Sequence, residues 1–222
     1  MSDIVSNILL LKQQLPSYVK LVAVSKTKSV GEILEVYNTG QRIFGENRVQ
    51  ELLSKKELLP QDIEWHLIGH LQSNKVKYIV PFISMIHSVD SFKLLSAIDA
   101  EALKNGTKVN CLLQFHIARE ETKSGFSPEE VTEMMESEEF RLLRSVRLCG
   151  VMGMATYTDD EGQVRNEFRF LTECFKKLKG KYFSADTGFA EISMGMSGDY
   201  KIAIEEGSTI IRIGSLIFGE RL

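Results

Sequence analysis

Two basic side chains lie at the end of an apolar run or within one. Lys26 follows the run 21–25, and strand alternation would place it on the same face as Val22 and Val24. An apolar setting desolvates a lysine and lowers its pKa, and the neutral amine that results is what Schiff-base chemistry with an aldehyde requires. A surface lysine that ends a strand is the alternative, and this segment alone slightly favours that alternative.

Arg212 lies inside the apolar run 210–214, where an unpaired guanidinium is costly. Alternation groups it with Ile210 and Gly214, so its side chain can point into a barrel. Two interpretations stay open at this point. Arg212 is either a functional group that faces a ligand or a structural one that bridges to a carboxylate.

Two turns rich in glycine and serine, residues 193–199 and 214–219, suit an anion. Glycine lets a backbone approach closely, and hydroxyl and N–H groups donate to phosphate oxygens, especially where a helix begins. The alternative is a pair of tight turns in which Ser197 or Asp199 caps a helix. An amine, an inward arginine and a phosphate site would together suit a phosphorylated aldehyde.

The other candidates carry weaker signals. His66 and His70 are four residues apart, but a zinc site needs further ligands, so no metal site is expected. We interpret His66 as a core residue and His70 as one that can face the site. Asn47 follows an apolar run and can hydrogen-bond a ring substituent. The three cysteines form no CxxC pair and indicate neither a zinc site nor a redox site: Cys111, Cys149 and Cys174.

Short apolar runs alternate with segments of helical periodicity along the whole chain. The expected strands are residues 20–25, 42–45, 65–69, 85–89, 109–117, 148–154, 191–194 and 209–213. The expected helices cover about 31–38, 48–56, 73–80, 92–104, 128–136, 161–179 and 200–205, and an amphipathic segment at 4–14 precedes the first strand. This alternation predicts parallel strands, and eight units predict one α/β domain over residues 1–222, a single (β/α)8 TIM barrel with an extra N-terminal helix. A doubly wound sheet is the alternative, but it usually has a GxGxxG turn after its first strand, and residues 25–29 contain no glycine.

Function in such a barrel is located at the C-terminal ends of the strands. Lys26 and Asn47 then lie at this end, and Arg212 lies two residues before it. The turns 193–199 and 214–219 follow the seventh and eighth expected strands, where barrels commonly bind phosphate. This position favours the phosphate interpretation of the two turns over simple capping.

The composition excludes several classes of protein. The chain has 222 residues, of which 43% are hydrophobic and 26% charged, so it is neither a disordered chain nor a disulfide miniprotein. A net charge of −3 indicates no nucleic acid and no anionic membrane surface as partner. No apolar run approaches the ~20 residues of a spanning helix, and the N-terminus lacks the pattern of a signal peptide. A cytoplasmic protein is expected, and a monomer, since no interface stripe stands out.

Seven motifs occur in unbroken order from about residue 21 to the C-terminus. They are VAVSKTK at 22–28, FGENRVQE at 44–51, WHLIGHLQSNK at 65–75, KSGF at 123–126, MGM at 152–154, SMGMS at 193–197 and RIGSLIFGER at 212–221. Together they resemble the YggS/PROSC family of pyridoxal 5′-phosphate (PLP) homeostasis proteins. Each motif alone is modest, and their number and order make the resemblance specific.

The resemblance implies a barrel similar to the N-terminal domain of bacterial alanine racemase, with PLP held as an internal aldimine on Lys26. It implies that Arg212 faces the pyridine nitrogen and that Asn47 lies close to the ring. The segments at Ser197 and at Gly214 and Ser215 would hold the phosphate. The expected cofactor site also includes two further residues, Val24 and Met194. The sequence departs from the family pattern at two positions: Ser29 replaces a frequent proline, and Ser215 replaces a frequent threonine. Ser215 keeps the hydroxyl group of the threonine.

The expected function is therefore binding of PLP and its homeostasis, with PLP-dependent enzymes as recipients and with no catalytic residue. An arginine beside the pyridine nitrogen disfavours its protonation and makes the cofactor a weak electron sink. Alanine racemases bring a second base from a separate β-domain, for which a chain ending at Leu222 leaves no residues. Two rivals remain. Turnover of L- to D-alanine would indicate a one-domain amino-acid racemase, and a colourless protein would indicate a sugar-phosphate aldolase with a Schiff-base lysine.

Overall fold

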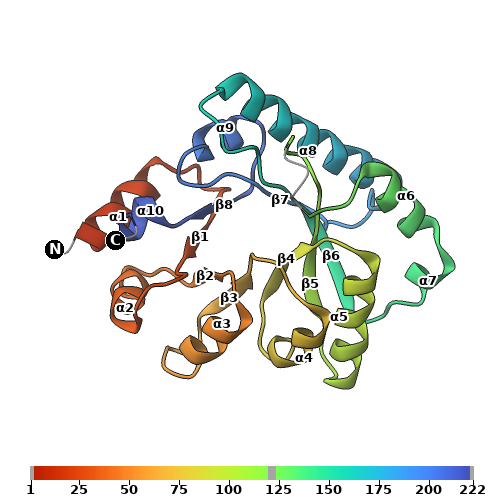
Figure 1. The fold of residues 1–222 in the computed structure, drawn as a ribbon, viewed down its shortest axis with the longest axis horizontal. Helices are drawn as coiled ribbons and strands as arrows, with labels where there is room; N and C mark the ends of the chain where they lie inside the picture. Colours follow the sequence, from red (N-terminus) through yellow and green to blue (C-terminus); the bar gives the residue numbers. More distant parts are fainter. Residues whose placement is uncertain (1–2, 120–123, 221–222) are drawn as a thin grey trace.

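A closed barrel of parallel strands forms the centre of the molecule in this computed structural model, which describes residues 3–119 and 124–220 (Figure 1). Within these residues each strand pairs with the next one along the chain, and the eighth pairs with the first. The strands are β1 (Lys20–Val24), β2 (Ile43–Glu46), β3 (Glu64–Leu67), β4 (Met85–Val89), β5 (Val109–Gln114), β6 (Val146–Met152), β7 (Glu191–Ser193) and β8 (Ile210–Ile213). The expected (β/α)8 barrel is confirmed.

Helices surround the barrel and connect its strands (Figure 1). Serine caps show why two of them begin where they do: the Ser29 hydroxyl caps the Glu32 amide while the Glu32 carboxylate accepts from the Ser29 amide, and Ser127 and Glu130 repeat this capping box. The helices are α1 (Asp3–Gln14), α2 (Val30–Asn38), α3 (Val49–Lys56), α4 (Val76–Ile79), α5 (Phe92–Lys104), α6 (Pro128–Glu136), α7 (Glu138–Arg141), α8 (Glu161–Tyr182), α9 (Tyr200–Glu205) and α10 (Ser215–Phe218), with a 3₁₀ turn at Ser73–Lys75.

Two apolar cores hold the barrel together. Alternating residues of each strand point inward or outward, so Val22 belongs to the interior while its neighbours Leu21 and Ala23 pack against the helices. The interior core is small and consists of Val22, Met85, Leu112, Cys149, Met152 and Ile210. The large outer core lies between strands and helices, as in other parallel sheets that are covered on their outer face.

The structure corrects some expected boundaries. The strand expected over 109–117 ends at Gln114: the Phe115 amide still donates to the Met152 oxygen of β6, and Phe115 then pairs with Phe126. The helix expected over 73–80 is a 3₁₀ turn followed by the short α4. The helices α7 and α10, which have four residues each, were not among the expected helices. The amphipathic segment at 4–14 is confirmed as α1, which lies beside α10 (Figure 1).

All three cysteines are free and buried. Burial raises the pKa of the Cys174 thiol to about 11 and also raises the pKa of Cys111 and Cys149, so these thiols are unreactive at neutral pH. In the part of the chain that the structure describes, no helix is long and apolar enough to cross a membrane.

Candidate functional site

The C-terminal ends of β1, β2 and β8 bring several predicted cofactor residues together. β1 and β2 pair with Val24 opposite Gly45, so Lys26 and Asn47 each lie two residues beyond a matched position on neighbouring strands. On the other side of β1, Gly214 follows β8 and lies against Val24, since a Cβ added to Gly214 would be 3.5 Å from the Val24 Cβ. These residues occupy one side of the barrel mouth.

Lys26 and Lys28 differ in environment although one residue separates them. Lys26 is half-buried and follows two buried residues at the end of β1. Lys28 is engaged elsewhere: its Nζ donates to the backbone oxygen of Phe218 at 3.1 Å and pairs with the Glu32 carboxylate at 3.3 Å. Lys28 therefore ties the start of α2 to the end of α10, while Lys26 lies where the sequence predicts an amine.

Arg212 points into the barrel, as strand alternation predicts, and is almost fully buried. Its Nη1 donates to Ser193 Oγ at 2.6 Å and its Nη2 to the Gly153 backbone oxygen at 3.0 Å, which places the guanidinium at the ends of β6 and β7. Among the described residues, no carboxylate lies within ion-pair distance of it, so it is not a structural bridge to an acid. Burial lowers the pKa of Arg212 to about 10, so the group keeps its charge at neutral pH.

A chain of buried polar side chains continues from Arg212 across the barrel. Ser193 Oγ lies 2.9 Å from His87 Nδ1, and His87 Nε2 lies 2.9 Å from His66 Nδ1. An arginine can only donate, so Ser193 accepts from Arg212. If the Ser193 hydroxyl donates to His87 Nδ1, His87 carries its proton on Nε2 and donates to His66. The reverse direction, from His66 through His87 to Ser193, satisfies the same distances while both histidines are neutral.

Burial keeps these histidines neutral. It lowers the pKa of His66 to about 3, with the positive charge of Lys20 contributing, and it lowers the pKa of His87 well below its ordinary value. The interpretation of His66 as a core residue is confirmed. His87 was not predicted from the sequence, and Ser193 was predicted only as part of the turn 193–199. The available signal was alternation in the fully buried β4, which groups His87 with Met85 of the interior core.

The two glycine- and serine-rich turns meet at the mouth. The backbone amide of Leu216, in the first turn of α10, points to Ser197 Oγ at 3.5 Å. Gly195 has φ +96°, and a Cβ there would lie 2.6 Å from the Ala203 Cβ, so the tight turn after β7 requires glycine. The Asp199 carboxylate accepts from the Met196 amide at 2.5 Å instead of capping the amides of α9 with a side-chain bond.

The remaining predicted residues are placed as follows. Asn47 is half-buried, and its backbone touches Gly69 so closely that a Cβ on Gly69 would be 2.5 Å from the Asn47 oxygen. The Met194 side chain is fully buried in the outer core, so the structure does not bring it to the mouth. His70 is exposed and lies 3.2 Å from the Asp90 carboxylate.

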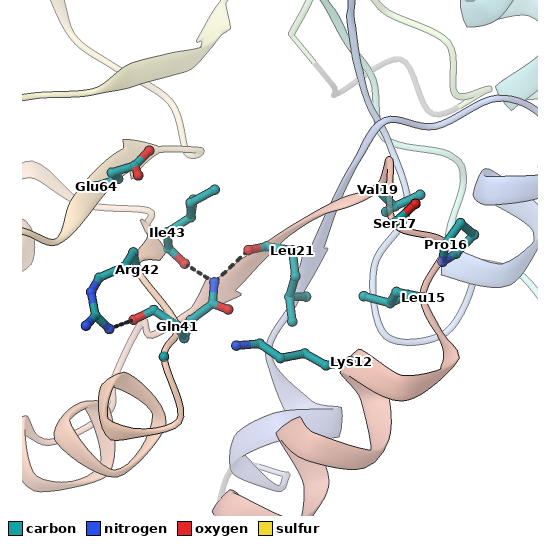
Figure 2. A pocket seen from close by; sticks show the side chains of 11 residues that line it. Lys12, Leu15, Pro16, Ser17, Val19, Leu21, Gln41, Arg42, Ile43 and Glu64 are labelled. Carbon is teal, nitrogen blue, oxygen red and sulfur yellow. Dashed lines mark hydrogen bonds between the residues drawn. The ribbon is translucent and has the colours of Figure 1, made fainter.

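A pocket of about 370 Å³ lies at the opposite end of the barrel (Figure 2). It is lined by residues at the starts of β1, β2 and β3, among them Val19, Arg42 and Glu64. Gln41 fixes this end by donating from its side-chain amide to the backbone oxygens of Leu21 and Ile43, as Figure 2 shows. Strand starts are the end of a TIM barrel that serves stability rather than catalysis, so this pocket is separate from the mouth that holds Lys26.

Comparison with known proteins gives a consistent result. The family model described as alanine racemase, N-terminal domain, matches residues 1–222. The pyridoxal phosphate homeostasis protein of Aquifex aeolicus is 43% identical over 204 residues, which are 91% of this chain and 87% of that protein. The protein of the same name from Bos taurus is 40% identical over 212 residues, 91% of this chain and 77% of that protein.

Solved structures agree with this result. PipY of Synechococcus elongatus, solved with PLP bound, is 35% identical and superposes with a TM-score of 0.86 over 97% of this chain and all of PipY. An alanine racemase of Clostridium difficile shares the fold with a TM-score of 0.76, but it is 16% identical, and the match covers 56% of that longer chain. This chain therefore belongs to the alanine racemase N-terminal domain family, in the branch that contains the pyridoxal phosphate homeostasis proteins.

Proposed function

We propose that this chain binds PLP reversibly through Lys26 and acts in the homeostasis of that cofactor. The observation that carries the proposal is the convergence at one barrel mouth of a half-buried amine, a buried guanidinium and two serine-bearing turns. The printed names of the relatives and the PLP bound to PipY support it.

The donor set fits PLP group by group. Lys26 offers an amine to the aldehyde, while Ser197, Ser215 and the backbone beside Gly214 offer hydroxyl and amide donors to the phosphate. Arg212 would face the ring nitrogen, and its positive charge would keep that nitrogen unprotonated. PLP supplies electron-sink chemistry when its ring is protonated, and this residue weakens that property. The set favours holding the cofactor over catalysis with it.

Lys26 forms its covalent bond to PLP by a condensation in which no atom changes oxidation state. Its neutral Nζ adds to the aldehyde carbon, the carbonyl oxygen leaves as water with both protons of the amine, and a C=N bond replaces C=O. Addition of water reverses the step and releases the aldehyde. A carrier needs this reversibility because release restores both partners unchanged.

The absorption spectrum of purified protein loaded with PLP, before and after borohydride, tests the proposal. We expect a visible band that borohydride abolishes, and peptide mapping should then place the pyridoxyl group on Lys26. A colourless protein that takes no label from added PLP would refute a covalent carrier.

The racemase alternative is not favoured, since the likeness to solved racemases is one of fold alone. We infer that the pure loaded protein does not convert L- to D-alanine, and a coupled assay for D-alanine measures this directly. We also infer that the protein is a cytoplasmic monomer that passes PLP to PLP-dependent enzymes. Light scattering on the purified chain tests the monomer, and reactivation of an apo-enzyme in the presence of the loaded protein tests the transfer.

A further inference from the structure

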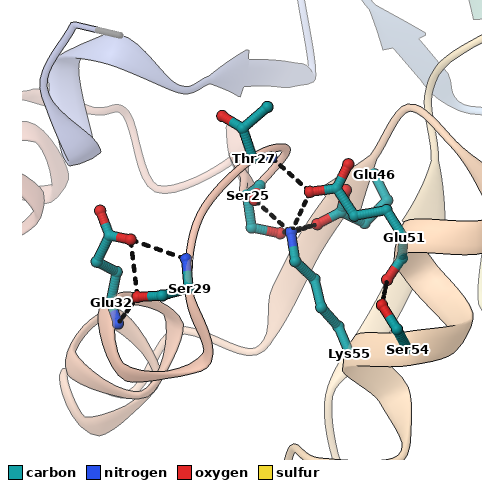
Figure 3. Close-up of polar contacts among 8 residues, drawn as sticks. All are labelled: Ser25, Thr27, Ser29, Glu32, Glu46, Glu51, Ser54 and Lys55. Carbon is teal, nitrogen blue, oxygen red and sulfur yellow. Dashed lines mark hydrogen bonds and ion pairs between the residues drawn. The ribbon is translucent and has the colours of Figure 1, made fainter. Parts of the chain in front are cut away.

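A buried ionic cluster lies directly beneath the turn that carries Lys26. It consists of Glu46 at the end of β2, Glu51 and Lys55 on α3, and the Ser25 and Thr27 backbone on either side of Lys26 (Figure 3). The Glu46 side chain is fully buried and the Lys55 side chain is 8% exposed. None of these residues belongs to the donor set proposed for PLP.

The Lys55 ammonium uses its full hydrogen-bonding capacity in this cluster. It donates at 2.7 Å to each of three acceptors, the Glu46 carboxylate, the Glu51 carboxylate and the Ser25 backbone oxygen. An ammonium has three N–H donors, so these three bonds fix its position. A buried ion pair adds little net stability, because desolvation of the two charges offsets their attraction. Stability alone therefore does not account for the cluster.

What the cluster fixes is the backbone on both sides of Lys26. On one side Lys55 holds the Ser25 carbonyl, and the Ser25 hydroxyl donates to Glu46 at 2.6 Å. On the other side the Thr27 amide donates to the same Glu51 oxygen that binds Lys55. One ammonium thus connects, directly or through one carboxylate, to the peptide groups that flank Lys26 (Figure 3).

Thr27 shows that this turn needs holding. Its φ is +67°, and it is the one non-glycine residue with positive φ in the part of the chain that the structure describes. A β-branched residue in the left-handed region is strained and persists only where its surroundings enforce the conformation. The bond from the Thr27 amide to Glu51 enforces it, and Lys55 holds Glu51 in place.

The same cluster also fixes the neighbouring strand end. Glu46 is the last residue of β2 and immediately precedes Asn47, so its bonds to Lys55 and Ser25 join the ends of β1 and β2. We propose that Lys55 is a positioning residue that presents the Lys26 amine to the aldehyde by holding the strained turn at Thr27. This inference rests on the proposed function of Lys26.

The charge on Glu46 decides which variants are informative. Burial raises the pKa of this carboxyl despite the bonds from Lys55 and Ser25, and among the described residues its Oε2 has no hydrogen-bond partner. Removal of Lys55 alone leaves a buried carboxyl that must take up a proton. The variant Lys55→Met is therefore measured beside the double variant Lys55→Met/Glu46→Gln, in which no unpaired charge is left in the core.

The test compares two probes that differ only at the reacting carbon. Pyridoxal phosphate has the aldehyde, and pyridoxine phosphate has an alcohol that cannot form C=N. For Lys55→Met and the double variant we expect the affinity for pyridoxal phosphate to fall at least tenfold and that for pyridoxine phosphate to change less than twofold. Equal losses for both probes, or no loss, would overturn the positioning role.

Lys56→Met is the matched control, since it removes a lysine from the next position of α3. Lys56 contacts Glu57 at 3.4 Å and the Phe82 ring, away from the cluster. The Lys56→Met variant should have the same ratio of the affinities for pyridoxal phosphate and pyridoxine phosphate as the wild type.

If the Lys55 variants do not fold, Glu51→Ala replaces them, because Glu51 is partly exposed and its loss frees the Thr27 amide. Glu51→Ala should lower the affinity for the aldehyde at least threefold more than that for the alcohol, and an unchanged ratio would refute the proposal.

Wild-type protein and Lys26→Ala separate this inference from the proposed function. If the wild type binds the two probes equally and borohydride fixes no label, the proposed function fails. If the wild type prefers the aldehyde through Lys26 and the Lys55 variants match the Lys56 control, only the positioning role fails. Hydrogen exchange at the Thr27 amide in ligand-free protein gives an independent result, with exchange at least tenfold faster expected in Lys55→Met.

Discussion

At the scale of single residues, the two lysines after β1 show how local contacts distinguish an amine for chemistry from an amine for structure. The Lys28 ammonium is held by Phe218 and Glu32, whereas Lys26 lies half-buried at the barrel mouth. We therefore expect Lys26→Ala to reduce borohydride-fixed pyridoxyl label to background, and Lys28→Ala to keep the label at the wild-type site. Mass spectrometry of reduced, digested protein measures both variants. A pyridoxyl label found on Lys28 in the wild type would contradict the assignment of Lys26 as the Schiff-base residue.

Arg212 gives a second prediction at this scale. Two hydrogen bonds to neutral oxygen atoms, rather than an ion pair with an acid, hold its guanidinium in place. If Arg212 keeps the ring nitrogen of PLP unprotonated, the pKa of that nitrogen should increase in the order wild type, Arg212→Gln, Arg212→Glu. A carboxylate stabilises a pyridinium, so the last step should exceed about one pKa unit, equivalent to about 1.4 kcal/mol.

Nitrogen-15 NMR of labelled cofactor measures this protonation directly. The comparison is made at saturating PLP, since Arg212→Glu also weakens binding. A ring nitrogen that is protonated in the wild type would contradict the view that this site holds its cofactor with little catalysis.

At the scale of elements, the loops after β7 and β8 act together because Ser197 and the start of α10 meet. A hydroxyl bonded to a phosphate dianion contributes about 1.5–3 kcal/mol. Ser197→Ala should therefore weaken PLP binding between about tenfold and about a hundredfold. The same variant should leave the binding of pyridoxal, which lacks the phosphate, unchanged. Isothermal titration of both ligands measures the difference, and an equal loss for the two would contradict a phosphate site at these loops.

The order of strands and helices could be predicted from the sequence because buried parallel strands are apolar on both faces, and helices between them keep a 3.6-residue period. Boundaries could not be predicted as well. The run expected as a strand extends from Val109 to Ile117, but the strand ends after six residues, since Phe115 pairs with Phe126 after a last amide bond to Met152. The four-residue α10 is too short to show a period.

The site could be predicted in part for a similar reason. Lys26, Asn47 and Arg212 are polar residues at or near the ends of apolar runs, and the barrel topology alone brings them to one end. The polar chain beyond Arg212 could not be predicted, because His87 and Ser193 meet across 106 positions of sequence. Nor does any local pattern show that Lys55, in the last turn of α3, reaches the Ser25 backbone. Met194 stays a prediction, and since its side chain faces the outer core, its backbone is the part that can face the site.

At the scale of the whole molecule, the polar chain from Arg212 to His66 crosses the barrel interior at the level of the apolar residues Val22, Met85 and Met152, which pair in register with members of the chain. We expect the Ser193 hydroxyl to donate to His87, which places the proton of both histidines on Nε2. Nitrogen-15 chemical shifts of the two rings in ligand-free protein report this tautomer. A proton on Nδ1 of His87 would show that the chain runs in the reverse direction and that Ser193 accepts from both His87 and Arg212.

The same burial links folding to pH. An unfolded chain binds a proton at each histidine near pH 6.5, whereas folded His66 does so only near pH 3 and folded His87 well below pH 6.5. These lowered folded-state values mean that stability is fully present above about pH 6.5 and is lost as pH falls toward the folded values. For each histidine that stays neutral in the folded chain, the free energy of unfolding decreases by up to about 1.4 kcal/mol for every unit by which the pH falls in this range.

Carboxyl groups also titrate below pH 5, so the variant His66→Asn isolates the contribution of one histidine. The asparagine oxygen can replace Nδ1 as the acceptor for His87, and the side chain does not titrate. Urea unfolding at pH 6.0 and pH 5.0 should give a loss of stability that is smaller in His66→Asn than in the wild type by up to about 1.4 kcal/mol. Identical losses in the two proteins would mean that His66 takes up its proton in the folded protein in this pH range, which would contradict the argument that burial keeps it neutral.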